Sequence, residues 1–224
     1  MLSDDDGDKR ALANPEQLRA TLNVIPAYTW YAASSGGLTF VNKRTADYLG
    51  LPRDHPLRFG IDTGAAWDAH IPFLHPDDHD ETRMVWSNCL RTGEAGEVSF
   101  RVRNAQGGYR WFLSRAEPLR ASDGTLLQWV GVNLDIEELK RAEQALMRSE
   151  AYLAEAQKLT HTGSWAWDPR TEKVLYCSEE MFRIFGLDPR ESLPSRDNFR
   201  QQIHPEDRDW VKKRFEESLR ERVR

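Results

Sequence analysis

His75-Pro76-Asp77-Asp78 recurs as His204-Pro205-Glu206-Asp207, and this repetition decides how the chain is divided. A Gly-Leu pair precedes each copy, in Tyr48-Leu49-Gly50-Leu51 and in Ile184-Phe185-Gly186-Leu187. Because the motifs keep their order, the pattern indicates a duplicated module. A much longer stretch of chain follows the first histidine motif than the second, so we expect the second copy to be incomplete.

Length and composition limit the classes of protein to which this chain can belong. Its 224 residues correspond to about two domains of roughly 100 to 150 residues each. The content of 39% hydrophobic and 30% charged residues is typical of a soluble globular protein. The net charge is -5 and the basic residues are interspersed with acids, which argues against a nucleic-acid partner.

The sequence also predicts where the protein resides. No apolar run approaches the roughly 18 residues that a membrane-spanning helix needs, so we expect no membrane segment in this chain. The acidic start, Met1–Asp6, lacks the basic and apolar regions of a signal peptide. We therefore expect a cytoplasmic protein, in which the two cysteines, Cys89 and Cys177, are reduced thiols.

The front of the first copy predicts a hairpin followed by short helices. Residues 28–31 and 38–41 are strand-like and flank a turn rich in Ser and Gly. Asn42 is suited to cap a short helix over 43–49. The motif at 75–78 is typical of a helix start, with Pro in the first turn and carboxylates near the positive end of the helix dipole.

The helix after this motif is expected to bury one face and to end at Gly93. Its predicted buried residues are Met84, Val85, Asn88 and Cys89.

Residues 97–135 change to a period of two and predict three antiparallel strands. The alternating apolar residues are Val98, Phe100 and Val102, then Tyr109, Trp111 and Leu113, then Val130, Val132 and Leu134. Together with the first hairpin, these strands make a five-stranded antiparallel sheet with short helices on one face. The predicted fold class is therefore α+β.

These residues resemble the PAS family, in particular the PAS domains of bacterial sensor histidine kinases and diguanylate cyclases. The resemblance lies in the motif at 75–78, the run Gly107-Gly108-Tyr109-Arg110-Trp111-Phe112, the Asp123-Gly124 turn and the closing run from Trp129 to Ile136. The predicted organisation is a disordered tail with an N-terminal helix at 1–24, a complete PAS domain at 25–137, a coiled-coil signalling helix at 138–160, and the N-terminal half of a second PAS domain at 161–224.

The segment between the copies has the pattern of a coiled coil. It contains no Gly or Pro from Ile136 to Leu159, and Leu139, Leu146 and Leu153 recur every seven residues. We expect a parallel homodimer formed by this helix and by PAS surfaces. The alternative is a solitary amphipathic helix lying on one PAS sheet.

The resemblance also assigns residues to signal transmission. It implies that Asp135, at the junction of strand and helix, both caps the helix and bonds to the core, with Ile136 and the leucine seam at 139, 146 and 153 carrying the change onward. Glu137 stands where relatives have Thr, which leaves part of that network open.

No metal site is predicted. His75, Asp77, Asp78 and His79 have the chemistry to ligate a divalent ion, but the second copy has Arg208 in place of His79, and a helix start explains the pattern. His161 lacks the flanking residues of a phospho-accepting histidine, so we interpret it as a connector residue.

No cofactor is predicted either, and haem and flavin remain alternatives. Cys89 lacks the surrounding motif and the position of a flavin-reactive cysteine, which favours a structural thiol. The weak candidates for lining a pocket are Trp30, Trp67, His70, Trp86 and Trp111. These aromatic residues would suit a small apolar ligand, and core filling explains them equally well.

The sequence shows no catalytic triad, no Gly-rich phosphate loop, and no kinase or cyclase signature. We therefore predict a non-catalytic sensory and dimerisation module that converts the state of a ligand or partner into a change in its linker helix. One alternative is the sensory fragment of a histidine kinase or diguanylate cyclase whose catalytic domain, a downstream partner, is missing. Another is a haem- or flavin-dependent sensor.

Overall fold

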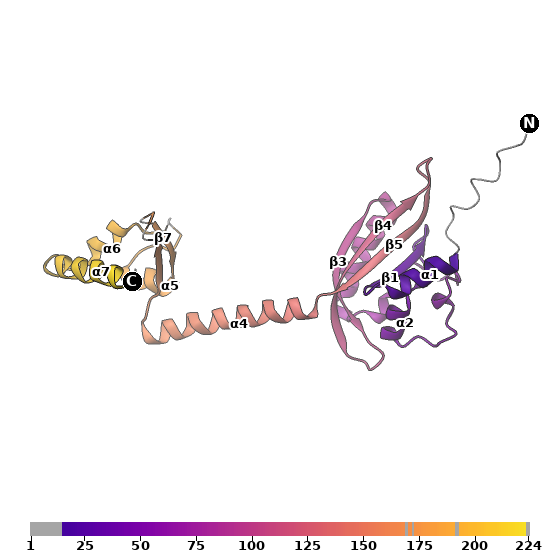
Figure 1. The fold of residues 1–224 in the computed structure, drawn as a ribbon, viewed down its shortest axis with the longest axis horizontal. Coiled ribbons are helices and arrows are strands. Elements are labelled where there is room, and N and C mark those ends of the chain that lie inside the picture. The colour runs from indigo at the N-terminus through magenta and orange to yellow at the C-terminus, as the bar shows by residue number, and fades with distance from the viewer. Residues whose placement is uncertain (1–14, 169, 172, 191–192, 223–224) are drawn as a thin grey trace, which may run out of the picture. The chain divides into compact units, whose positions relative to one another are not determined.

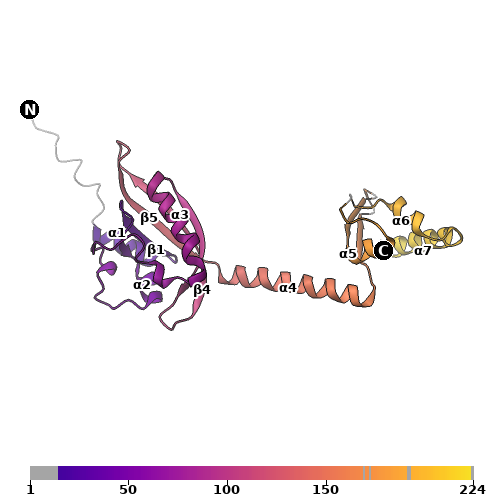
Figure 2. The ribbon, with the colours of Figure 1, turned by 180° about the vertical axis from the view of Figure 1, so that it is seen from behind.

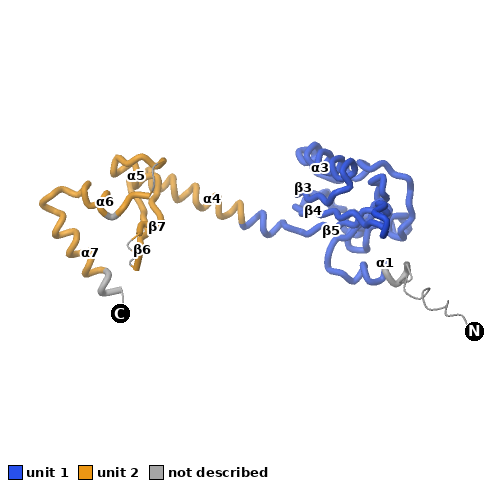
Figure 3. Tube along the Cα trace, turned by 90° about the horizontal axis from the view of Figure 1, so that it is seen from above, with its two compact units in different colours: residues 1–142 blue, residues 143–224 orange. Residues whose placement is uncertain are grey.

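The computed structural model describes residues 15–168, 170–171, 173–190 and 193–222. The chain divides into two compact units, residues 1–142 and 143–224, which are coloured separately in Figure 3. The tail predicted to be disordered lies outside the described residues.

The first unit is built on one antiparallel sheet with strand order β2-β1-β5-β4-β3. Its strands are β1 (Tyr28–Ala33), β2 (Leu38–Val41), β3 (Gly96–Arg103), β4 (Tyr109–Arg120) and β5 (Leu126–Asp135). Its helices are α1 (Pro15–Val24), α2 (Lys43–Leu49) and α3 (His79–Thr92), with short 3-10 turns η2 (Pro56–Arg58), η3 (Ile71–Phe73) and η4 (Pro76–Asp78). The predicted α+β fold is confirmed, including the two-then-three order of its strands (Figure 1).

Local sequence signals account for the first short helix. The Asn42 side chain accepts a hydrogen bond from the backbone N–H of Thr45 at 3.0 Å, as an N-cap does. Gly50 ends α2 with φ 70°, a left-handed conformation that favours glycine. The cap and the stop lie where the sequence predicted them.

The core lies between the sheet and the helices α2 and α3, which cover the same face (Figure 2). We call this face of the sheet the inner face and the opposite one the outer face. Two groups of buried side chains fill the core. They are Ala32, Trp86, Cys89, Ala116 and Trp129 in one, and Ile71, Leu74, Phe100, Val102 and Phe112 in the other.

Two predicted buried faces are corrected by the structure. In α3 Cys89 is buried as predicted, together with Thr82 and Trp86, whereas the predicted Met84 and Asn88 are exposed. In β4 the inner face carries Phe112, so the predicted apolar series that includes Trp111 lies on the outer face. A shift of one residue along a strand moves a side chain to the opposite face, because successive side chains alternate.

A long helix, α4 (Glu137–Thr160), follows β5, and the boundary between the two units falls within it. After Thr160, His161 adopts φ 51° and the Thr162 N–H bonds to the carbonyl of Gln157 at 3.0 Å, closing the helix. No helix among the described residues is long and apolar enough to cross a membrane.

The second unit continues with a two-stranded antiparallel sheet and further helices. These elements are β6 (Trp165–Asp168), β7 (Lys173–Cys177), α5 (Glu179–Phe185), α6 (Arg196–Gln202), the 3-10 turn η5 (Pro205–Asp207) and α7 (Arg208–Arg222). Ser178 caps α5 and Gly186 ends it with φ 65°, which repeats the arrangement of Asn42 and Gly50 around α2.

Candidate functional site: a core cavity and its link to the long helix

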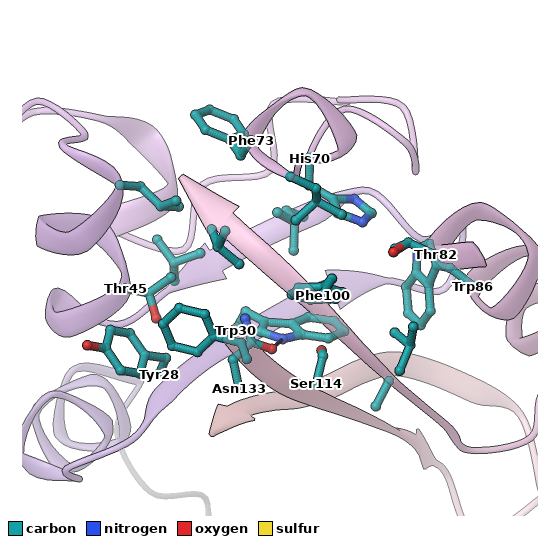
Figure 4. Close-up of a pocket in the computed structure, with 18 of the residues that line it drawn as sticks. Tyr28, Trp30, Thr45, His70, Phe73, Thr82, Trp86, Phe100, Ser114 and Asn133 are labelled. Atoms are coloured by element: carbon teal, nitrogen blue, oxygen red, sulfur yellow. Dashed lines mark hydrogen bonds between the residues drawn. The ribbon is translucent and has the colours of Figure 1, made fainter. Parts of the chain in front are cut away.

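The first unit contains a cavity of about 180 Å³ between the inner face of the sheet and the segments that cover it (Figure 4). Most of its wall is apolar, including Leu38, Val41, Leu74, Val85, Val98 and Phe100. Such a wall favours a ligand that is itself mainly apolar, because transfer of apolar surface out of water is the main source of binding energy there.

The polar groups on the wall are largely bonded within the protein. The Trp30 indole N–H donates to Oδ1 of Asn133 at 3.0 Å, and the Tyr48 hydroxyl donates to the carbonyl of Val102 at 2.9 Å. Burial is the main reason why the pKa of Tyr48 is raised to about 12, so this side chain stays a neutral phenol. The Trp86 indole N–H is an exception, because it is buried with no hydrogen-bond partner among the described residues.

His70 lies at the cavity wall opposite Asn133 and Ser114 (Figure 4). Burial lowers the pKa of His70 below its ordinary value, and the Trp67 carbonyl and Asp68 offset only part of this effect. The imidazole is then neutral at pH 7. Its Nδ1 lies 3.0 Å from the carbonyl oxygen of Trp67, which places the proton on Nδ1 and leaves Nε2 as an acceptor.

Three of the five predicted pocket residues line the cavity, and two lie elsewhere. Trp30, His70 and Trp86 line the cavity. Trp67 packs beside the buried group around Trp129 instead. Trp111 lies on the outer face, where its ring contacts the charged groups of Arg101 at 5.0 Å and Lys140 at 5.7 Å. Its expected place in a pocket was wrong because the residues of β4 that face the core are Phe112, Ser114 and Ala116, one position along from Trp111.

The volume of the cavity can be compared with the volumes of known ligand sites. An engineered cavity of about 150 Å³ accepts benzene, whereas pockets for drug-sized ligands span about 300 to 1,000 Å³. At about 180 Å³ this cavity matches the smaller class, and a porphyrin or isoalloxazine ring is several times larger than benzene. Cys89 is buried, and that burial raises the pKa of its thiol.

The predicted helix start at 75–78 has two separate functions. The His75 ring accepts a hydrogen bond from the Asp77 N–H at 3.3 Å, as a cap does. Asp78 does not cap a helix but binds the edge strand β3. Its Oδ2 accepts from the Arg101 backbone N–H at 2.8 Å, and its Oδ1 lies 2.7 Å from the Arg101 guanidinium. Sequence reasoning missed this link, because Arg101 lies 23 residues further along the chain, in a strand.

Burial and the hydrogen bonds from Arg101 act on the pKa of Asp78 in opposite directions. Burial acts to raise the pKa of Asp78, but bonds from the side chain and backbone of Arg101 outweigh it, and the net pKa lies below its usual value. Within the described residues, no group of three or more His, Cys, Asp or Glu side chains is gathered in the geometry of a metal site.

The junction between β5 and α4 is held by a compact network. Asp135 accepts from the Glu137 N–H at 3.1 Å through Oδ1, and its Oδ2 lies 3.0 Å from Nε of Arg110. The Ile136 N–H donates to the carbonyl of Trp111 at 3.0 Å. Glu137 returns a bond, because its Oε2 accepts from the Trp111 N–H at 3.0 Å. Glu137 thus takes part in the junction, which the sequence had left open.

Beyond this junction, the side chains of the leucine seam do not pack within the described chain. Leu139, Leu146 and Leu153 are 64%, 61% and 56% exposed. Three exposed leucines at seven-residue intervals on a 24-residue helix are typical of a surface that pairs with another helix.

The sequence model of the family described as "PAS fold" matches residues 39–133 and again 174–223, which together are more than half of the chain. This chain therefore belongs to the PAS family. A PAS domain is a sensory module that is not itself catalytic.

Curated relatives come from bacteria and yeast. An uncharacterized protein, y4lL, of Sinorhizobium fredii is 34% identical over 62% of this chain and 16% of its own length. The peroxide stress-activated histidine kinase mak1 of Schizosaccharomyces pombe is 29% identical over 61% and 8%. Sensor protein FixL of Bradyrhizobium diazoefficiens is 32% identical over 47% and 20%. The aligned region thus spans only a small part of each relative.

Among solved structures, a sensory box histidine kinase/response regulator from Burkholderia thailandensis is 26% identical, with a TM-score of 0.45 over 63% of this chain and 99% of the other. The PAS domain of a protein from Colwellia psychrerythraea is 14% identical, with a TM-score of 0.42 over 55% and 97%.

Proposed function

We propose that the first unit senses a small, mainly apolar ligand in its core cavity and transmits occupancy to α4, which pairs with α4 of a second chain. The output is a change in the packing of that helix pair, passed to a histidine kinase or diguanylate cyclase domain or partner. The relatives support the choice of output, because they include a histidine kinase and a probable diguanylate cyclase.

One observation carries this proposal: strands β4 and β5 supply residues of the cavity wall and also the residues that hold the start of α4. Phe112 lines the cavity, and its neighbour Trp111 bonds Ile136 and Glu137 through its backbone. Asn133 also lines the cavity and lies two residues before Asp135. A ligand that shifts β4 or β5 therefore acts on the atoms that hold the helix.

Benzene is a suitable probe, since a cavity of about 150 Å³ accepts it. We expect benzene to shift the amide NMR signals of the cavity strands and of residues 135–141 in the 224-residue chain. Ser114→Leu should abolish both shifts by filling the cavity from its wall. Ser99→Leu, the same change on the outer face of the neighbouring strand, should preserve them. If Ser114→Leu responds to benzene as the unmodified chain does, the ligand site lies elsewhere.

The haem alternative rests on His70, whose Nδ1–H bond to a backbone carbonyl is the arrangement that orients histidine ligands of metals. The cavity volume opposes it, and we propose that neither haem nor flavin binds. An absorbance spectrum of the chain, recorded after incubation with hemin and with flavin mononucleotide, tests this directly. A Soret shift that is lost in His70→Ala, or a bound flavin band, would contradict the proposal.

A further inference from the structure

We propose that the first unit carries a second ligand site, for a small oxyanion with two or more negative charges, in a polar hollow at the root of α4. The hollow has a volume of about 430 Å³, and its polar lining includes Arg44, Asp47, Asn104, Gln106, Arg110 and Asp135. Tyr28 and Tyr48 line both this hollow and the core cavity, so they form the wall between the two.

Arg44 supplies a charge that the fold leaves uncompensated. Its guanidinium lies 5.1 Å from the centre of the Tyr28 ring, and it forms no ion pair with any residue that the structure describes. Asp47, the nearby acid on α2, is engaged by Lys43 and by Arg58 at 2.8 Å. Arg44 is thus held over an aromatic face with its donors available.

Arg110 supplies the second charge. Its Nε lies 3.0 Å from Oδ2 of Asp135, and 40% of the side chain is exposed. Its two terminal amino groups donate no hydrogen bond to any residue that the structure describes, so they remain for another acceptor. A planar guanidinium binds carboxylate or phosphate oxygens in pairs, so two such groups suit an anion with several oxygens.

The amide of Asn104 adds a neutral donor. Its Oδ1 already accepts from the backbone N–H groups of Gln106 and Gly108, each at 2.9 Å. Its NH₂ group is therefore the part left for a ligand. The available groups in the hollow are mainly donors, which is why the inferred ligand is an anion.

Occupancy of this hollow would act on the junction directly. Arg110 is the cation that faces Asp135, and the other oxygen of Asp135 caps the first residue of α4 at 3.1 Å. An oxyanion that binds Arg110 competes with Asp135 for the same positive charge. Binding therefore loosens the cap and changes how firmly α4 begins, independently of the core cavity.

The ligand chemistry is shared by phosphate monoesters and dicarboxylates, so the test uses inorganic phosphate and succinate separately. Each is titrated into the 224-residue chain at constant ionic strength, because unspecific charge effects are screened equally in this way. Amide NMR signals of Arg110 and Asp135 report binding, and hydrogen exchange of residues 136–141 reports coupling. We expect saturable shifts and faster exchange with at least one anion, and which anion acts identifies the source.

Arg44→Gln should weaken the affinity about tenfold or more, the usual effect of losing a charged hydrogen-bond pair. Arg53→Gln removes the same charge from an exposed loop position outside the hollow and should leave the affinity unchanged. The site is overturned if neither anion saturates, or if both variants bind alike. The coupling is overturned if saturation leaves the exchange of residues 136–141 unchanged.

Discussion

Gly131 shows how one small residue makes room for the cavity wall. It pairs in register with Trp30 on the neighbouring strand. A Cβ added at Gly131 would lie 2.0 Å from the Trp30 indole, which no relaxed structure permits. Trp30 in turn packs edge-on against Trp86, with ring centres 5.6 Å apart. Glycine is required here by the close approach of an aromatic ring.

Gly131→Ala should therefore destabilise the first unit by about 1 to 3 kcal/mol, the usual cost of overpacking a core. Urea unfolding followed by tryptophan fluorescence measures this cost. Gly108→Ala is the control, because its added Cβ would meet Asn104 at an ordinary 3.4 Å. Equal stability of the two variants would show that Trp30 moves aside freely.

Asp78 should make stability depend on pH through its bonds to Arg101. Its pKa is lower in the folded state than in the unfolded state, so its contribution is present above about pH 4 and is lost as pH falls through the folded pKa. Asp78→Asn removes that contribution. The stability difference between the unmodified chain and Asp78→Asn, from urea unfolding, should be largest near pH 6 and shrink towards pH 3.

The control for this pH effect is Asp80→Asn, because Asp80 is fully exposed and its contact with Arg83 spans 3.6 Å. A difference for Asp78→Asn that stays constant from pH 6 to pH 3 would show that its carboxylate charge does not stabilise the fold.

At the scale of elements, the proposed pairing of α4 with a second chain can be tested at its leucine seam. Leu146→Lys places a charge in the middle of the exposed leucine seam, where desolvation and like-charge repulsion would oppose association of two helices. Sedimentation should show this variant shifted towards monomer. Arg148→Ala, an exposed change on the same helix, should sediment as the unmodified chain does. Unchanged association of Leu146→Lys would place the interface elsewhere.

The elements themselves were more predictable than the faces that they bury. Helix α3 illustrates why. Its apolar residues are compatible with either of two adjacent faces being buried, and the face that is buried is the one that carries Thr82. The Thr82 hydroxyl donates to the Asp78 carbonyl at 2.7 Å, so a polar side chain is buried at no cost in lost hydrogen bonds. A prediction that counts only apolar residues ignores this bond and places Met84 on the buried face instead.

Strand β4 shows the same limit on its outer face. Trp111 is large and apolar, which predicts an inward position, yet it lies on the outer face, where its ring contacts the charged groups of Arg101 and Lys140. The cavity was equally beyond prediction. Trp30, His70 and Trp86 were chosen by residue type, but whether they enclose a space depends on how all the side chains around them pack.

At the scale of the whole molecule, the two units should differ in stability. The sheet of the second unit has two described strands, and two-stranded sheets are marginal without further cover. Its strands expose Trp165 by 44% and Leu175 by 62%. The first unit pairs five strands around two buried groups.

Hydrogen exchange of the 224-residue chain should therefore show the strands β6 and β7 exchanging before the strands β4 and β5. The helix α1 serves as an internal reference for a peripheral element of the first unit. Equal protection of β6 and β5 would show that the second unit gains cover, for example from another copy of the chain.

The hydrogen bonds between Trp111 and the start of α4 bear on how the helix would move when a ligand binds. Both backbone groups of Trp111 are engaged, one by Ile136 and one by Glu137. A hydrogen bond prefers an angle above about 150° and weakens steeply only below about 120°, so a small rotation of the helix leaves both bonds in place and a larger one breaks them. We therefore expect a two-state response at the junction, in which weak and strong ligands differ in the fraction of molecules that respond and the displacement is the same in each.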